Sequence, residues 1–92
     1  MIKKFRHKGL RLFFEYDDGS KLPPDMLERI RLILSTLHAA VEIEGMKLPG
    51  FDLHPLKGDL KGFWSVTVRA NWRIIFKFED GNALDVDFID YH

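Results

Sequence analysis

The spacing of hydrophobic residues changes once along this 92-residue chain, from helical spacing before about residue 46 to alternation after it. The helical part contains one apolar stripe, made of Leu27, Ile30, Ile33, Leu34, Leu37, Ala40 and Val41. This stripe predicts a helix that begins at Pro24, which suits a first helical position, and that ends near Gly45. A shorter helix is predicted over residues 8–16. His7 and His38 are interpreted as solvated residues at a helix end and on a helix face.

Short alternating runs, separated by turn residues, make up the rest of the pattern. The predicted strands cover residues 2–6, 51–56, 63–70, 72–79 and 83–91. Pro55 limits its strand to an edge of the sheet or a bulge, and Asp80, Gly81 and Asn82 form a hairpin turn. With no internal repeat or linker, this order predicts one α+β domain over residues 1–92. Its helices pack on one face of a small, mainly antiparallel, twisted sheet.

Strict alternation along a strand determines which side chains share a face. On this basis Arg69 and Arg73 both lie opposite the aromatic face, close enough to hold one anion. In the last strand the count predicts inward positions for Leu84, Val86, Phe88, Asp90 and His92, and an outward position for Tyr91. A surface that combines Asp90 with the arginines therefore needs a twist or bulge after Phe88, or a site at the end of the sheet.

Composition and charge exclude several classes of protein. Without cysteine the chain has no disulfide bond, catalytic thiolate or cysteine-based zinc site. No signal peptide is apparent and no apolar run reaches the roughly 20 residues of a membrane span, so a cytoplasmic protein is expected. Basic and acidic residues number 14 each, so any contact with nucleic acid has to come from a local patch. Basic residues gather in residues 1–11 and 57–77.

Several side chains along the second half of the chain suit phosphate chemistry. These candidates are His54, Lys57, Lys61, Arg69, Arg73, Asp90, Tyr91 and His92. Histidine moves protons near neutral pH, while arginine and lysine bind phosphate oxygens. Together they favour RNA cleavage through the ribose 2′-hydroxyl, which needs a base, an acid and cations but neither a metal nor another cofactor.

Each candidate also has an ordinary structural interpretation. The segment around His54 fits a polar loop, and the two arginines fit surface ion pairs with acids of the last strand. The last three residues fit an exposed terminus. A metal site made of His54, Asp90 and His92 is a further alternative, although no metal-binding spacing occurs in the chain.

Four segments, in order along the chain, carry a resemblance to a known family. They run from Met1 to Leu10, from Leu53 to Asp59, from Trp64 to Ile74 and from Asp90 to His92. Together they resemble HigB-type toxins of the RelE/ParE superfamily of bacterial toxin–antitoxin systems. The resemblance implies a RelE-like fold and cleavage of messenger RNA in the A site of the 70S ribosome. It also implies a HigA-type helix-turn-helix antitoxin, through which the pair binds operator DNA, and no contact with membranes.

The resemblance also implies roles for the site residues. His92 is expected to act as general base, with Asp90 orienting it, and His54 is expected to act as acid or phosphate ligand. Lys57 and Arg73 are expected to stabilise the phosphate, and Tyr91 is expected to stack on or orient a base. Lys61 and Arg69 are expected to bind RNA. Many relatives are strongly basic, so this neutral chain is expected to bind with weaker salt dependence. A non-catalytic, ParE-like gyrase inhibitor and an inert antitoxin-binding module are the alternatives.

Overall fold

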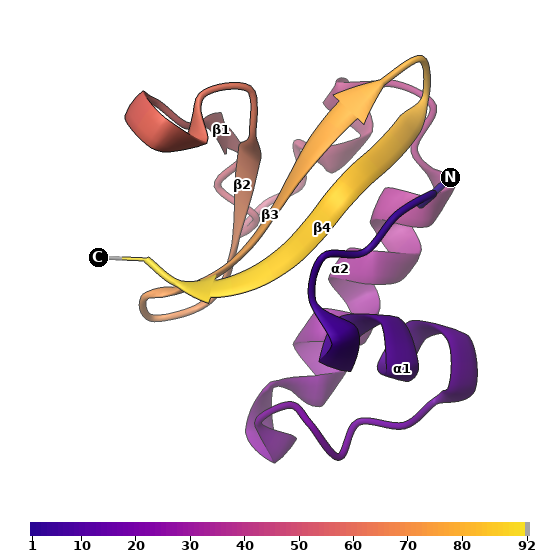
Figure 1. Ribbon diagram of the computed structural model, residues 1–92. Helices are drawn as coiled ribbons and strands as arrows, with labels where there is room; N and C mark the ends of the chain where they lie inside the picture. The colour runs from indigo at the N-terminus through magenta and orange to yellow at the C-terminus, as the bar shows by residue number, and fades with distance from the viewer. Residues whose placement is uncertain (92) are drawn as a thin grey trace.

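The elements follow the order that the hydrophobic spacing predicts, with helices before strands (Figure 1). The computed structural model describes residues 1–91. The helices are α1 (Lys8–Tyr16) and α2 (Leu27–Ala39), and the strands are β1 (His54–Pro55), β2 (Trp64–Arg69), β3 (Trp72–Glu79) and β4 (Asn82–Asp90). Short 3-10 helices cover Pro24–Met26, Ile43–Met46 and Gly58–Leu60. The predicted α+β class is confirmed.

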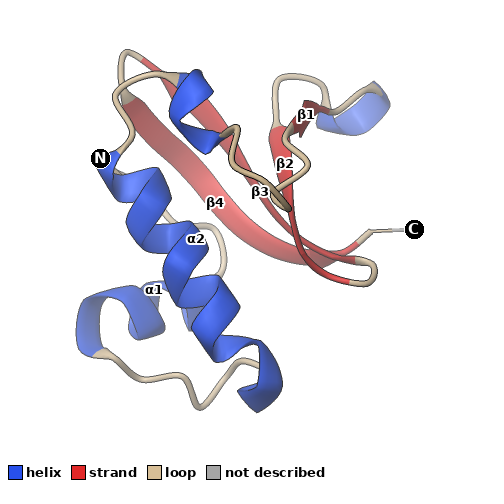
Figure 2. Cartoon of the chain, turned by 180° about the vertical axis from the view of Figure 1, so that it is seen from behind, coloured by secondary structure: helices blue, strands red, loops and turns tan. Residues whose placement is uncertain are grey.

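Both helices lie on one side of the sheet, and the opposite side, called the outer face below, carries neither of them (Figures 1 and 2). α1 packs against β4, and α2 packs against β2 and β4. The main core between these layers includes Leu10, Ile33, Leu37, Ile74 and Phe76. A smaller apolar cluster on the outer face contains Leu56, Phe63 and Ile75. Within residues 1–91, no helix combines the length and apolar character needed to cross a membrane.

The long helix begins as predicted but ends earlier. Pro24 opens the 3-10 helix that leads directly into α2. At the other end Ala40 turns to an extended conformation (ψ 130°) while its N–H still bonds to carbonyls of the last turn, so the helix closes well before Gly45. Val41, predicted to lie in the apolar stripe, is therefore 79% exposed. The separate 3-10 helix that follows brings Met46 into the core instead.

His7 and His38 have structural contacts, which corrects the prediction that they are simply solvated. The His7 Nδ1 accepts a hydrogen bond from the Leu10 N–H at 3.2 Å and so caps α1. The His38 Nδ1 accepts one from the Ile2 N–H at 3.1 Å, and its ring centre lies 5.1 Å from that of Phe14. Each ring satisfies a backbone donor that has no partner in a helix or a ladder.

The strand order is β1-β2-β3-β4, and every neighbouring pair is antiparallel. β1 is an edge strand, as Pro55 predicts, but it spans only two of the residues predicted to be extended. Asp52 (φ 50°) has a left-handed conformation, which interrupts strand geometry just before β1. The predicted strand at residues 2–6 is reduced to two isolated parallel bridges from Ile2 and Phe5 to β4.

A register shift in the β3–β4 pairing changes which residues of β4 face the core. The shift includes Asp85, whose φ of 51° is typical of a bulge residue. Val86 and Phe88 are buried as predicted, but Ala83 rather than Leu84 occupies the core position before the bulge. Strict alternation misses this exchange because one extra residue moves the side chains that precede it to the other face.

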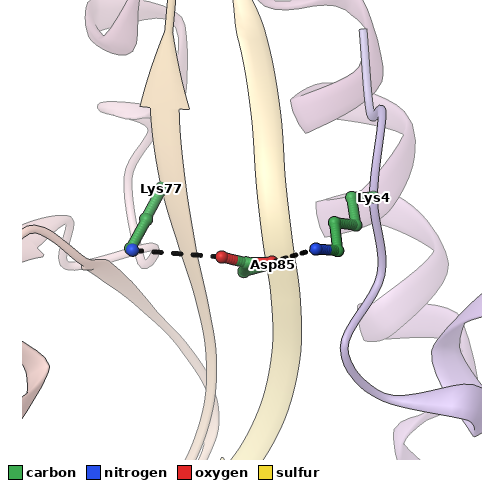
Figure 3. Close-up of polar contacts among 3 residues, drawn as sticks. All are labelled: Lys4, Lys77 and Asp85. Atoms are coloured by element: carbon green, nitrogen blue, oxygen red, sulfur yellow. Dashed lines mark ion pairs between the residues drawn. The ribbon is translucent and has the colours of Figure 1, made fainter.

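The Asp85 carboxylate also joins the N-terminal segment to β3. One oxygen lies 3.7 Å from the Lys4 Nζ, and the other lies 3.9 Å from the Lys77 Nζ on the opposite side (Figure 3). The Lys4 side chain is 72% exposed and that of Lys77 is 40% exposed, so solvent weakens both ion pairs. The backbone conformation is therefore expected to matter more at this position than the charge.

Two substitutions at Asp85 separate these contributions. Asp85→Asn is expected to lower the free energy of unfolding by at most about 1 kcal/mol, because asparagine tolerates a positive φ and only the ion pairs are lost. Asp85→Val places a β-branched residue in the same conformation and is expected to cost about 1–3 kcal/mol more. Urea unfolding of both variants measures the difference. Equal losses would show that the bulge conformation does not constrain this position.

Candidate active site on the outer face

Directly paired residues of an antiparallel sheet share a face, and one such row crosses all four strands on the outer face. This row consists of His54, Ser65, Ile75 and Asp87. The neighbouring row consists of Thr67, Arg73 and Ile89. Given the usual strand spacing and rise, the Cα atoms of His54 and Arg73 are about 12 Å apart. Their side chains can therefore approach one nucleotide from two sides.

His54 is oriented for proton transfer by the chain just before it. Its Nδ1 lies 2.9 Å from the backbone oxygen of Asp52. Because a carbonyl oxygen only accepts hydrogen bonds, Nδ1 carries the proton in this contact, and the Nε2 of a neutral ring then has a lone pair. Such a ring can take a proton from a hydroxyl group through Nε2 and return it to a leaving oxygen. The contact therefore suits His54 to either general base or general acid chemistry.

Arg73 retains hydrogen-bonding capacity for a ligand. Its Nη1 donates to the carbonyls of Ala70 and Trp72, which belong to the turn between β2 and β3 and its edge. Its Nε is buried and has no hydrogen-bond partner within residues 1–91. A guanidinium group has five N–H donors, so these two contacts leave several of them for phosphate oxygens. Arg73 is the arginine whose position in the sheet shares the outer face with His54.

Arg69 does not share that face, which contradicts the prediction of an arginine pair. A register shift between Thr67 and Arg69 pairs Arg69 with Trp72, and Trp72 packs against the main core. On that side of the sheet the Arg69 Nη1 forms an ion pair with Asp25, in the 3-10 helix before α2. The physical reason is the bulge, which turns the end of β2 by one residue. Arg69 and Arg73 therefore cannot clamp one anion from the same face.

The last described residues lie at the end of the sheet, beside the turn between β2 and β3 (Figure 1). There the Tyr91 N–H donates to the Asn71 carbonyl at 2.8 Å. Pairing with β3 is continuous from Phe88 to Asp90, so no bulge follows Phe88 and alternation directs Asp90 toward the helix side and Tyr91 toward the outer side. This register is compatible with a site at the end of the sheet. His92 lies outside the described residues.

Lys57 and Lys61 lie in the connection between β1 and β2, on either side of its 3-10 helix. Both side chains are exposed. Across residues 1–91, none of the ion pairs involves either of them. A cation of this kind can bind a phosphate group without first leaving an acidic partner. The connection therefore adds positive charge next to His54.

Two further features of the outer face were not predicted from the sequence. The Arg6 Cζ and the Lys77 Nζ each lie 5.2 Å from the centre of the Phe63 ring. Arg6 and Lys77 belong to the two basic runs of the chain, residues 1–11 and 57–77, which therefore meet on one face. This meeting depends on how the N-terminal segment is aligned along β4. Ser65 is fully buried, and its Oγ has no hydrogen-bond partner within residues 1–91. Nothing in the alternation pattern distinguishes this serine from an exposed one.

The outer face thus combines the His54 imidazole with several cations, which is a donor set for moving a proton while stabilising negative charge on phosphate oxygens. Among residues 1–91, no three His, Asp or Glu side chains are grouped closely enough to hold a metal ion. The metal site considered from the sequence includes His92, which is not among those residues.

The chain is similar to known proteins in both sequence and fold. Residues 3–92 match the family described as the RelE-like toxin of the type II toxin–antitoxin system HigB. The chain is 48% identical, over 100% of both proteins, to endoribonuclease HigB of Proteus vulgaris. It is 34% identical to toxin HigB-1 of Vibrio cholerae, over 100% of this chain and 98% of that protein. The crystal structure of a YafQ mutant from E. coli has a TM-score of 0.63 at 19% identity, covering 96% of this chain and 89% of that one, which is a likeness of fold.

Proposed function

The chain belongs to the HigB family of RelE-like toxins of type II toxin–antitoxin systems, and on that premise we propose that it is a ribosome-dependent endoribonuclease that cleaves messenger RNA in the ribosomal A site. A toxin of a type II system has an antitoxin as its partner. We further propose that this antitoxin is of the HigA type, with a helix-turn-helix that binds operator DNA. The toxin then acts in the bacterial cytoplasm, where its ribosomal substrate is found.

The observation that carries the proposal is the outer-face arrangement of His54 and Arg73, together with Lys57 and Lys61 beside β1, which form no ion pair within residues 1–91. Proton transfer and charge stabilisation are the two requirements of RNA transesterification. A protein that only blocks gyrase has no need of an imidazole held in one tautomer. The relative that is 48% identical is named an endoribonuclease, which supports the same reaction.

In the proposed reaction the ribose 2′-hydroxyl attacks the adjacent phosphorus and the bond from phosphorus to the 5′ oxygen breaks. A base takes the 2′ proton, an acid protonates the leaving 5′ oxygen, and the upstream fragment ends in a 2′,3′-cyclic phosphate. His92, oriented by Asp90, acts as the base, and His54 acts as the acid. As the acid His54 carries a proton on Nε2 and as the base it does not, but its Nδ1 donates to the Asp52 carbonyl in both forms, so exchange of the two roles is compatible with this contact. No bond-making step calls for a metal ion.

The remaining site residues bind and orient the RNA. Arg73 and Lys57 stabilise the charge that develops on the phosphate oxygens, because both are cations on or beside the outer face. Tyr91, which is 41% exposed, stacks on or orients a base. Lys61 binds a neighbouring phosphate. Arg69 contributes at most to a flanking phosphate on the helix side, where its partner is an acid.

Programmed ribosomes test the proposal against its alternatives. A defined messenger RNA is incubated with the protein in the presence and absence of ribosomes, and DNA gyrase supercoiling is measured in parallel. We expect a cut within the A-site codon only when ribosomes are present, and full gyrase activity. Equal cleavage of free RNA would rule out dependence on the ribosome. An intact message together with inhibited gyrase would contradict the nuclease function.

A further inference from the structure

Arg29 of α2 connects the helix layer to the two backbone segments that carry the candidate site. Its Nη2 donates to the Gly50 carbonyl at 2.7 Å and to the Thr67 carbonyl at 3.0 Å. Its Cζ lies 4.9 Å from the centre of the Phe51 ring. None of the ion pairs within residues 1–91 involves Arg29, so its polar contacts go to the backbone rather than to a carboxylate.

These contacts provide hydrogen-bond partners for the part of the β2 edge that β1 is too short to pair with. β1 has two residues and β2 has six, so Thr67 lies beyond the last β1–β2 pair, that of His54 with Ser65. The Thr67 N–H donates to the Phe51 carbonyl at 2.8 Å, and Arg29 supplies the donor for the Thr67 carbonyl. Without Arg29 that carbonyl loses its partner at an open sheet edge.

The same guanidinium group holds the segment that orients His54. Gly50 (φ 86°) and Asp52 (φ 50°) both have left-handed conformations, and an aspartate keeps such a conformation at a cost that its surroundings have to offset. Arg29 anchors this segment at Gly50 and stacks on Phe51, and the next carbonyl, that of Asp52, accepts the hydrogen bond from the His54 Nδ1. The chain of contacts therefore runs from α2 to the imidazole.

We propose that Arg29 is a positioning residue for the reaction. By holding residues 50–52 against β2, it keeps the Asp52 carbonyl in place and so keeps His54 in the tautomer protonated at Nδ1, with Nε2 directed to the substrate. Arg29 also supports the backbone of Thr67, which is paired with Arg73 on the outer face. The role in catalysis rests on the proposed ribonuclease function, whereas the role in setting the tautomer does not.

Three variants test this role. Arg29→Met keeps an apolar stem over Phe51 but removes every donor. Arg29→Lys keeps the charge and has N–H donors on a single nitrogen, without the planar fork. Arg31→Met is the matched control on the same helix. Arg31 pairs with Asp17 at 2.8 Å and lies 4.6 Å from the Phe13 ring centre, so it makes similar contacts between helical elements. Thermal melts first establish that each variant folds.

Long-range ¹H–¹⁵N spectra of the imidazoles report the tautomer of His54 without any need for activity. We expect Nδ1 protonation in the wild-type protein and in Arg31→Met, and a mixture of tautomers in Arg29→Met. Single-turnover cleavage on programmed ribosomes is expected to fall about 10- to 100-fold in Arg29→Met at unchanged ribosome affinity, because small displacements of a reacting group are costly. The cleavage rate of Arg29→Lys is expected to lie between those of Arg29→Met and the wild-type protein. Arg31→Met is expected to cleave at the wild-type rate.

A folded Arg29→Met with the wild-type tautomer and the wild-type rate would overturn the proposal. So would equal losses in Arg29→Met and Arg31→Met, or a change in rate without a change in tautomer. If Arg29→Met does not fold, a wild-type tautomer and rate in Arg29→Lys would overturn it as well. Absence of cleavage by the wild-type protein would refute the ribonuclease function, while the spectra still decide whether Arg29 orients His54.

Discussion

Replacing His54 with glutamine is expected to slow single-turnover cleavage of ribosome-bound message by about 10²–10⁴-fold, the usual contribution of one general acid or base. Glutamine has a similar size and still forms hydrogen bonds, but it cannot exchange a proton near neutral pH. The half-buried side chain lies on a two-residue edge strand, so little of the core depends on it. Quench-flow measurement of cleaved message gives the rate, and a thermal melt checks the fold.

His92→Gln is expected to have an effect of the same order. The double variant is expected to lose little more than the worse single variant, because the effects of groups that act as a unit in one reaction are not additive. His38→Gln is the matched control, since its ring accepts the Ile2 N–H on the helix side of the sheet and has no place in the chemistry. It is expected to lower stability and leave the rate of the folded protein unchanged. A wild-type cleavage rate for His54→Gln would show that the active site does not lie on the outer face.

The second large effect is expected at Arg73, and it separates the two arginines that the sequence pattern treats alike. Arg73→Gln is expected to slow cleavage about 10²–10³-fold, as loss of a preorganised donor to a transition-state oxygen does. Arg69→Gln is expected to cost less than about tenfold, because Arg69 lies on the helix side and pairs with Asp25. Rates at saturating ribosome concentration isolate the chemical step from binding.

Salt dependence provides the control for this comparison. If Arg69 contacts only a flanking phosphate, Arg69→Gln is expected to weaken ribosome binding most at low salt and to make binding less dependent on salt, with little change in the rate of the bound complex. Arg73→Gln is expected to show the opposite pattern, a lower rate with similar binding. A larger loss of rate for Arg69→Gln than for Arg73→Gln would show that the register of β2 seen here does not describe the active protein.

The fold was predictable where local chemistry and burial agree. The stripe from Leu27 to Leu37 predicted α2 because a helix has to bury one apolar face. Pro55 predicted an edge strand because proline cannot complete a ladder, and β1 is an edge strand. The predicted end of α2 was wrong because Ala40 and Val41 continue the apolar spacing beyond the true end of the helix. The chain leaves the helix at Ala40, and the 3-10 helix that follows buries Met46. Hydrophobic spacing does not reveal where a helix is interrupted.

The faces of the strands were less predictable, since both register shifts act through single residues. The bulge before Arg69 and the one at Asp85 each reverse the alternation, and neither contains a glycine or proline that would signal it. The contacts of Arg29 were equally hidden, because they join its side chain to carbonyls far away in the sequence. Residue types thus indicated the chemistry, while the register decided which of those residues meet.

The outer face is proposed to cleave RNA by transesterification through the ribose 2′-hydroxyl. The most direct measurement uses programmed ribosomes carrying a message with a single 2′-deoxynucleotide on the 5′ side of the scissile phosphate, beside the same message in all-ribose form. The all-ribose message is expected to give an upstream fragment that ends in a 2′,3′-cyclic phosphate, and the deoxy-substituted message is expected to stay intact. Cleavage of the deoxy-substituted message, or an upstream fragment ending in a 3′-hydroxyl, would contradict attack by the 2′-hydroxyl.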